Sequence, residues 1–289
     1  MLTTIPSQAG ADRRSVSISA DDFDYIRMLI QRRSAIVLDA EKMYLAEARL
    51  NALARREGFA SLGDLLVVLR GERDETLTRK VVEAMTTNET SFFRDLVPFE
   101  SIRTVLLPEA IRQRQGERVL RIWSAACSTG QEPYSIAMIL AEHFPQLRDW
   151  NIQILATDLS TEILERAQCG RFSQLEVNRG LPARLLVKYF GKQGNDWFLQ
   201  DEIRKMVEFR EINLAGDWPL MHEFDIVLLR NVLIYFDMAS KRRILQRVRR
   251  LLKPWGSLIL GGAETTLNID DAYERVQLEK TIVYRRGKS

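Results

Sequence analysis

The chain has 289 residues, 46% of them hydrophobic, and its 42 lysines and arginines nearly balance 39 aspartates and glutamates. This composition excludes a mainly disordered chain, and a net charge of +3 gives no support for a nucleic-acid partner or an anionic membrane. Two cysteines and two histidines are too few for a disulfide framework or for a metal site with the usual set of about four ligands. With no recognisable signal peptide and no apolar run of roughly 20 residues, we expect a cytoplasmic protein without membrane insertion, metal or nucleic acid.

The N-terminal part of the chain has the pattern of a small helical domain. Residues 1–18 are predicted to be a mobile tail, and residues 19–85 to be all-helical. Ser19 precedes a first helix, a second spans about residues 40–57 and stops at Gly58, and shorter helices follow around residues 61–69 and 74–85. On the second helix a basic residue recurs at every seventh position, at Lys42, Arg49 and Arg56.

The pattern changes after residue 118. Short apolar runs, V-L-R-I-W, I-Q-I-L-A-T, D-I-V-L-L and S-L-I-L-G, alternate with helical segments around residues 132–142, 161–167 and 238–252. This alternation indicates a parallel sheet with helices on both faces, so residues 117–289 are predicted to be an α/β domain that follows a linker at 86–116. Residues 171–212 interrupt the alternation and are predicted to be a small β-rich insertion.

Polar or small residues stand where the predicted strands end, the edge at which such sheets bind nucleotide-like ligands. The first strand leads into S-A-A-C-S-T-G-Q-E-P-Y, either a close approach to a ligand or a tight turn into a helix. The second ends at Asp158, which can accept hydrogen bonds from ribose hydroxyls or cap the helix at Thr161. The third leads into Asn231 and Tyr235, which are also common turn formers. Taken together, these strand ends favour a nucleoside-containing cofactor.

A further motif, T-T-N-E-T-S-F-F-R-D, occupies residues 86–95 and alone could simply start a helix. Combined with the strand-end motifs and with L-R-N-V-L-I-Y-F, in this order and spacing, it resembles the bacterial chemotaxis receptor methyltransferases, the CheR family, over about residues 20–285. The resemblance implies a class I, Rossmann-like S-adenosylmethionine-dependent methyltransferase domain with a small β-subdomain, preceded by an all-helical domain. It also implies methylation of glutamate side-chain carboxylates on the cytoplasmic helical bundle of chemoreceptors, with S-adenosylhomocysteine as the product.

The resemblance extends to individual positions. Arg94 and Tyr235 match the family's orienting, catalytic positions. Lys42, Arg49, Arg55 and Arg56 match its receptor-facing second helix, although a solvated helix face is the commoner role of such a stripe. The loop at 191–197 is shorter than in members that bind a receptor's C-terminal pentapeptide, so we expect no peptide tether. The implied cofactor contacts are Asn88, Thr90, Arg94, Glu132, Asp158, Asn213, Leu214, Asn231 and Val232.

Two alternatives stay open from the sequence. One is an S-adenosylmethionine-binding regulatory protein without transferase activity, against which the intact Arg94 and Tyr235 argue. The other is a methyltransferase of another substrate class, although near-neutral charge and the lack of a base-handling aromatic motif disfavour nucleic acid. A glutamate carboxylate with a pKa of about 4.3 is already ionised at pH 7 and needs no general base, which fits the scarcity of histidine.

Overall fold

A computed structural model of the chain describes residues 18–71 and 73–287. All but the last residue of the predicted mobile tail therefore lie outside the described residues. The chain divides into two compact units, one containing residues up to Leu29 together with Leu38–Met85, and the other containing Ile30–Val37 together with the chain from Thr86 onward. The division passes through the first helix, and each unit is described separately below.

The first unit is helical, as the sequence predicts. Its helices are α1 (Ala20–Ser34, whose last turn belongs to the second unit), α2 (Met43–Arg56), α3 (Leu62–Arg70) and α4 (Glu75–Ala84). A short 3₁₀ turn, η1 (Ala40–Lys42), precedes α2. The side chains of Ser61 and Asp74 accept the backbone N–H groups of Asp64 and Leu77, which fixes the starts of α3 and α4.

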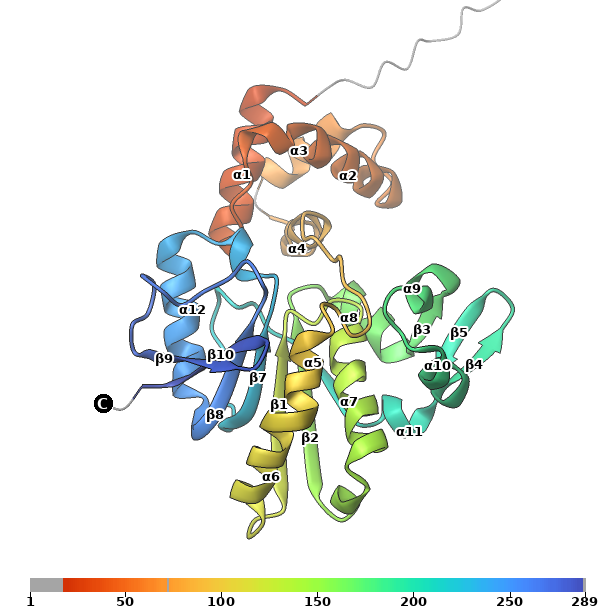
Figure 1. The fold of residues 1–289 in the computed structure, drawn as a ribbon. Coiled ribbons are helices and arrows are strands. Elements are labelled where there is room, and N and C mark those ends of the chain that lie inside the picture. The colour runs from red at the N-terminus through yellow and green to blue at the C-terminus, as the bar shows by residue number, and fades with distance from the viewer. Residues whose placement is uncertain (1–17, 72, 288–289) are drawn as a thin grey trace, which may run out of the picture. The chain divides into compact units, whose positions relative to one another are not determined.

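The second unit is built on a seven-stranded sheet with the order β6-β2-β1-β7-β8-β10-β9 (Figure 1). The first five strands run parallel to their neighbours, whereas β10 is antiparallel to β8 and β9. The strands are β1 (Val119–Ala125), β2 (Asn151–Asp158), β6 (Val207–Glu211), β7 (Phe224–Leu229), β8 (Leu252–Leu260), β9 (Tyr273–Leu278) and β10 (Thr281–Arg286).

Helices cover both faces of this sheet. The main ones are α5 (Val97–Ser101), the π-helical turn η2 (Ile102–Leu106), α6 (Leu107–Arg114), α7 (Gln131–His143), α8 (Thr161–Cys169) and α12 (Met238–Arg250), with a short 3₁₀ turn η4 (Leu233–Tyr235) before α12 and another, η3 (Pro145–Leu147), after α7. Because α5, η2 and α6 lie within residues 86–116, only the first part of the predicted linker is an irregular connector.

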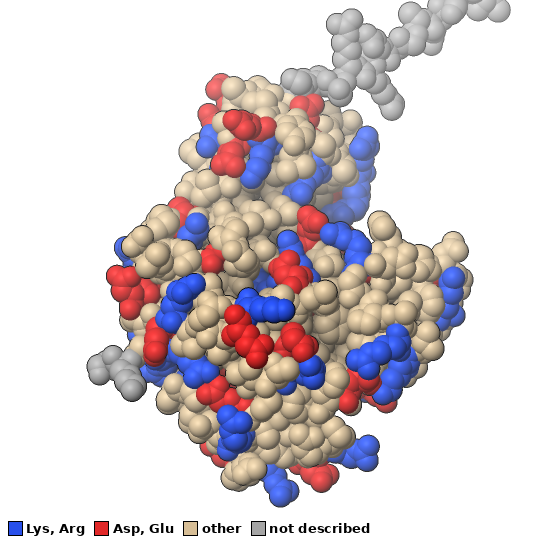
Figure 2. Space-filling view, in the orientation of Figure 1, with Lys and Arg blue, Asp and Glu red and all other residues tan. Residues whose placement is uncertain are grey.

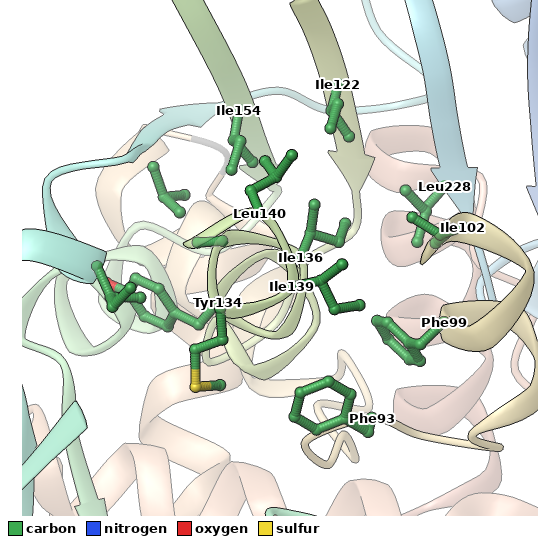
Figure 3. Close-up of a cluster of buried hydrophobic side chains, with 14 of the residues drawn as sticks. Phe93, Phe99, Ile102, Ile122, Tyr134, Ile136, Ile139, Leu140, Ile154 and Leu228 are labelled. Carbon is green, nitrogen blue, oxygen red and sulfur yellow. The ribbon is translucent and has the colours of Figure 1, made fainter. Parts of the chain in front are cut away.

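Side chains alternate between two buried clusters, as a sheet covered on both faces requires. Leu120 and Ile122 of β1 belong to one cluster, with α5, α6 and α7, and Trp123 and Ala125 belong to the other, with α12. Figure 3 shows the first cluster, in which Ile136 and neighbouring residues of α7 face the strands. On the face drawn in Figure 2, basic and acidic side chains are interspersed, in keeping with the small net charge. No helix in the described residues is long and apolar enough to cross a membrane.

The segment at 171–212 forms a small sheet of its own, as predicted, but it also contains helices and its last strand belongs elsewhere. Its small sheet has the order β3-β5-β4, formed by β3 (Arg171–Ser173), β4 (Phe190–Gln193) and β5 (Asp196–Leu199). Three short helices accompany it, α9 (Gln174–Asn178), α10 (Ala183–Tyr189) and α11 (Asp201–Arg204), each too short to display a clear helical period. The last part of the predicted insertion contains β6, which pairs with β2 and so belongs to the large sheet rather than to the insertion.

Candidate active site

The turn from β1 into α7 brings backbone to the carboxyl edge of the sheet. Ala126, Ser128 and Gly130 have φ values of 57°, 51° and 91°, in the left-handed region that most side chains avoid. The N–H of Cys127 donates to the carbonyl of Thr157 at 2.9 Å, which anchors the turn to β2. A strained turn of small residues thus leads directly into the buried helix α7.

Asp158 ends β2 and fixes the neighbouring turns. Its Oδ2 accepts the N–H of Ser128 at 2.9 Å, and its Oδ1 accepts the N–H of Ser160, the N-cap residue of α8, at 3.1 Å. Only 7% of the residue is exposed. These two bonds set the direction of the carboxylate at the point where the sequence predicts a ribose contact.

Cys127 lies in the same turn but is not available as a nucleophile. Burial, followed by the charges of Asp158 and Glu132, raises the pKa of its thiol well above the ordinary value. The thiol is therefore protonated at neutral pH, and a protonated thiol is a poor nucleophile.

Glu132, in the first turn of α7, and Arg230, which follows β7, form a buried ion pair. Oε2 of Glu132 accepts Nη1 of Arg230 at 2.9 Å, and Oε1 accepts the hydroxyl of Ser124 at 2.8 Å. Nη2 of Arg230 donates to the carbonyl of Arg94 at 3.0 Å and to the carboxylate of Asp95 at 2.7 Å. The pair therefore ties two strand ends to the irregular segment that carries Arg94.

That segment, residues 86–95, lies against the turn after β1. The carbonyl of Asn88 accepts the hydroxyl of Ser128 at 2.9 Å. Nη1 of Arg94 donates to the carbonyl of Glu89 at 2.9 Å, so the guanidinium folds back over its own segment. Thr90 lies between Asn88 and Arg94 in the sequence and is half-buried.

The segment after β7 carries Asn231, Val232 and Tyr235. Asn231 has a φ of 58°, and the backbone N–H groups of Asn231 and Val232 both donate to the carboxylate of Glu264, at 2.7 and 2.9 Å. The carbonyl of Tyr235 accepts the N–H of Val37 at 2.8 Å. This segment is therefore held by contacts outside the regular sheet.

Asn213 and Leu214 follow β6 at the same edge. Nδ2 of Asn213 donates to the carbonyl of Arg33 at 2.7 Å, and its Oδ1 accepts the N–H of Ala215 at 3.0 Å. Leu214 is buried, and Nε1 of Trp218 donates to its carbonyl at 3.2 Å. The loop is thus ordered by its own side chains.

Two family models match the chain. The all-alpha domain of CheR methyltransferase matches residues 21–86, and the S-adenosylmethionine (SAM) binding domain of CheR methyltransferase matches residues 88–282. The chain belongs to the CheR methyltransferase family. It is 43% identical to Chemotaxis protein methyltransferase 1 of Pseudomonas aeruginosa over 93% of this chain and 99% of that protein. It is 42% identical to Chemotaxis protein methyltransferase Cher2 of Pseudomonas putida, over 91% of this chain and 97% of that protein.

Among solved structures, the N-methyltransferase NodS of Bradyrhizobium japonicum is 16% identical to this chain, with a TM-score of 0.35 over 67% of this chain and 99% of that one. Membership of the CheR family confirms the predicted fold class, S-adenosylmethionine as the cofactor, and methyltransferase activity in chemotaxis. The alternative of an S-adenosylmethionine-binding regulatory protein without transferase activity is not supported.

The residues at this edge suit that cofactor. A carboxylate at a strand end matches a ribose diol, and a turn of small residues lets backbone approach a ligand, as at Ser128 and Gly130. The described residues contain no group of three His, Cys, Asp or Glu side chains arranged to hold a metal ion. The polar groups that suit S-adenosylmethionine therefore lie at the carboxyl edge of the sheet.

The structure gathers the residues predicted for the cofactor and the reaction in the second unit, at strand ends or in segment 86–95. The predicted basic stripe lies in the first unit and is less open than expected. Lys42 pairs with Asp39 at 3.0 Å, and Nη1 of half-buried Arg49 donates to the carbonyl of Ala84 at 3.4 Å. Arg55 and Arg56 are exposed.

Sequence reasoning missed two groups that organise this edge, Arg230 and Glu264. Arg230 stands inside the L-R-N-V-L-I-Y-F motif, so a buried strand running into an arginine was a signal for an ion pair. Glu264 follows G-G-A after β8, and a pair of glycines at a strand end was a signal of close backbone approach.

Proposed function

We propose that this CheR family member methylates glutamate side-chain carboxylates on the cytoplasmic helical bundle of chemoreceptors, giving glutamyl methyl esters. The observation that carries the proposal is the state of the two carboxylates at the sheet edge. Glu132 accepts the hydroxyl of Ser124 and Nη1 of Arg230, and Asp158, whose oxygens can accept more than one donor each, is assigned to the ribose, so neither carboxylate is placed as a general base. An ionised substrate carboxylate requires none, because its pKa lies about three units below neutral pH.

When bound, S-adenosylmethionine supplies the methyl group from a sulfonium centre, leaving S-adenosylhomocysteine. Asp158 accepts hydrogen bonds from the ribose hydroxyls in this proposal, and Asn213 and Leu214 line the adenine region. Asn88, Thr90, Asn231 and Val232 complete the contacts from the two irregular segments. Glu132 acts on the surroundings of the methionine group, since its own oxygens hold Ser124 and Arg230.

Arg94 and Tyr235 orient the reactants. A guanidinium and a phenol hydroxyl are both donors, and donors can hold a carboxylate oxygen in line with the methyl carbon and sulfur. Correct placement of this kind contributes several kcal/mol to a transfer between two bound reactants. Complete neutralisation of the nucleophile would be counterproductive, because binding energy spent on the ground state does not accelerate the step.

In this proposal the protein acts in the cytoplasm and contacts the receptor through Lys42 of η1 and through Arg49, Arg55 and Arg56 of α2. Arg55 and Arg56 carry the larger share, since they are exposed whereas Arg49 is half-buried. We propose no peptide tether on the β4–β5 hairpin. Charge reversal at Arg55 and Arg56 is expected to reduce receptor methylation at low salt, with a smaller effect at high salt, because exposed charges are screened.

Labelled S-adenosylmethionine and membranes containing chemoreceptors test the function directly. We expect label on the receptor that is released by mild alkali, because carboxyl methyl esters hydrolyse there and N-methyl groups do not. Membranes without receptors serve as the control. Alkali-stable label, or label on other proteins only, would contradict the proposed substrate while leaving the methyltransferase assignment intact.

A further inference from the structure

One carboxylate at the sheet edge has no role in the reaction outlined above. Oε2 of Glu264 accepts the N–H groups of Asn231 and Gly261, each at 2.7 Å. Its Oε1 accepts those of Val232 at 2.9 Å and Ile234 at 3.3 Å. A single side chain therefore collects four backbone donors, three of them from the segment that follows β7.

These contacts replace the regular sheet at this point. Beyond Leu229 the segment makes no further ladder contacts with β1 or β8, so its N–H groups need other acceptors. The left-handed φ of 58° at Asn231 turns the chain so that successive N–H groups converge on one anion, as in backbone nests. Bonds to a charged acceptor are roughly twice as strong as neutral ones, so the carboxylate is well suited to hold this uncommon backbone.

The fit around the carboxylate is close. A Cβ atom at Gly261 would lie 2.7 Å from Oε2 of Glu264 and 2.8 Å from the backbone nitrogen of Asn231. Only glycine allows the end of β8 to approach the end of β7 this closely. Among the described residues no ion pair of Glu264 occurs, so backbone N–H dipoles are its partners.

We propose that Glu264 is a positioning residue for methyl transfer, whose carboxylate fixes the backbone of residues 231–235 and thereby the placement of Asn231, Val232 and Tyr235. It touches neither reactant itself. The inference rests on the proposed function for the roles of those three residues. It adds that their geometry is set from the neighbouring strand end, by a side chain that follows β8.

The first test is Glu264→Gln in the full chain. The amide has nearly the same shape, but its NH₂ group faces two backbone donors where an oxygen accepted them. We expect kcat with receptor membranes to fall on the order of 10- to 100-fold. Glu274→Gln, which neutralises an exposed glutamate on β9, is the matched control and is expected to retain full activity. If Glu264→Gln does not fold, Glu264→Asp keeps the charge on a shorter arm, and wild-type kcat in either variant would overturn the proposal.

A double-mutant cycle separates positioning from general damage. We expect Tyr235→Phe to lower kcat much less in the Glu264→Gln background than in the wild-type chain. In that background the hydroxyl is already misplaced and contributes little to the rate, so its removal changes little. Multiplicative losses would overturn the positioning role. If Tyr235→Phe alone has full activity, the assigned role of Tyr235 fails instead. In that case a second cycle combines Glu264→Gln with Asn231→Ala and measures S-adenosylmethionine affinity by calorimetry. A smaller effect of Asn231→Ala in the Glu264→Gln background supports the positioning role, and multiplicative effects overturn it.

Discussion

Each end of the parallel sheet holds a buried arginine, and their surroundings differ. At the amino end, Nε of Arg114 donates to Oδ1 of Asp225 at 2.8 Å, and both side chains are fully buried. Nε1 of Trp255 donates to the same oxygen at 2.9 Å, and Oδ2 accepts the N–H of Arg121 at 2.9 Å. At the carboxyl end, Arg230 instead binds Glu132 together with the irregular segment at 94–95.

The difference lies in what each arginine connects. Arg114 and its partner Asp225 join regular elements, namely α6 and β7, so this ion pair fixes the fold. Arg230 joins a strand end to a segment without regular structure, so its ion pair fixes a site. Within the described chain each arginine also retains one buried nitrogen without a hydrogen-bond partner, Nη2 of Arg114 and Nε of Arg230. Burying an arginine is costly at both ends of the sheet. At the amino end the buried pair stabilises the fold, and at the carboxyl end it positions the residues of the site.

The largest effect is expected at the amino end. Arg114→Met leaves the Asp225 carboxylate buried without its cation, and breaking a buried pair in this way costs about 3–5 kcal/mol of unfolding free energy. Urea unfolding measures the loss, and methyl transfer per folded molecule should be unchanged. Arg112→Met, at an exposed position of the same helix, is the control and should stay within about 0.5 kcal/mol of wild type. A loss below about 1 kcal/mol in Arg114→Met would remove the contrast between the two ends.

At the carboxyl end, Arg94→Ala should affect the reaction more than folding or binding. Arg230 holds the carbonyl of Arg94, and the alanine variant keeps that carbonyl, so the segment remains anchored. We expect kcat to fall on the order of 100-fold, about 2.7 kcal/mol, while cofactor affinity measured by calorimetry changes much less. Equal losses in rate and affinity would show that the guanidinium binds the cofactor rather than orienting the reaction.

Asp158→Asn is expected to act mainly on binding. The amide retains one acceptor oxygen and turns an NH₂ group toward a backbone donor, Ser128 or Ser160. We expect S-adenosylmethionine affinity to fall roughly 10-fold or more, equivalent to about 1.4 kcal/mol, by titration calorimetry. Asp149→Asn, an exposed position next to the amino end of β2, is the control. Unchanged affinity in Asp158→Asn would mean that the ribose assignment is wrong.

The sequence predicts the elements at both ends well, because strands and helices follow from local periodicity. The end of β2 at Asp158 and the turn after β1 were both recognisable from strand-end residues. Placement of β6 was not predictable in the same way, because a short apolar run indicates a strand but not its partner. It lies next to β2, whereas the small sheet is formed by strands that precede it in the chain.

The ion pair of Arg230 with Glu132 and the contacts of Glu264 could not be predicted from the sequence, because they depend on the three-dimensional arrangement. Arg230 and Glu132 are 98 positions apart in the sequence, and Glu264 is 33 positions from Asn231. Each pair meets because β7 lies between β1 and β8 in the sheet, and strand order is not written in local patterns. The resemblance to the CheR family names positions, whereas the hydrogen bonds indicate which of them are held in place by others.

The smallest expected effect concerns the two thiols, and it tests whether solvent reaches the carboxyl end of the sheet. Cys127 is buried in the turn after β1, whereas Cys169 is exposed at the end of α8. Alkylation requires the thiolate, and burial together with the charges of Asp158 and Glu132 raises the pKa of Cys127. We therefore expect iodoacetamide at pH 8 to modify Cys169 alone in the native protein, and both cysteines in urea, as counted by mass spectrometry.

The same shift gives a pH dependence with a definite sign. A thiol whose pKa is higher in the folded chain keeps its proton there after the unfolded chain has lost it, so stability falls as pH rises above about 8.5. Cys127→Ala should remove this part of the alkaline loss, and Cys169→Ala should not. Rapid modification of Cys127 in the native protein would show that solvent reaches the turn after β1, so that this turn would not hold the site as firmly as the burial of Cys127 implies.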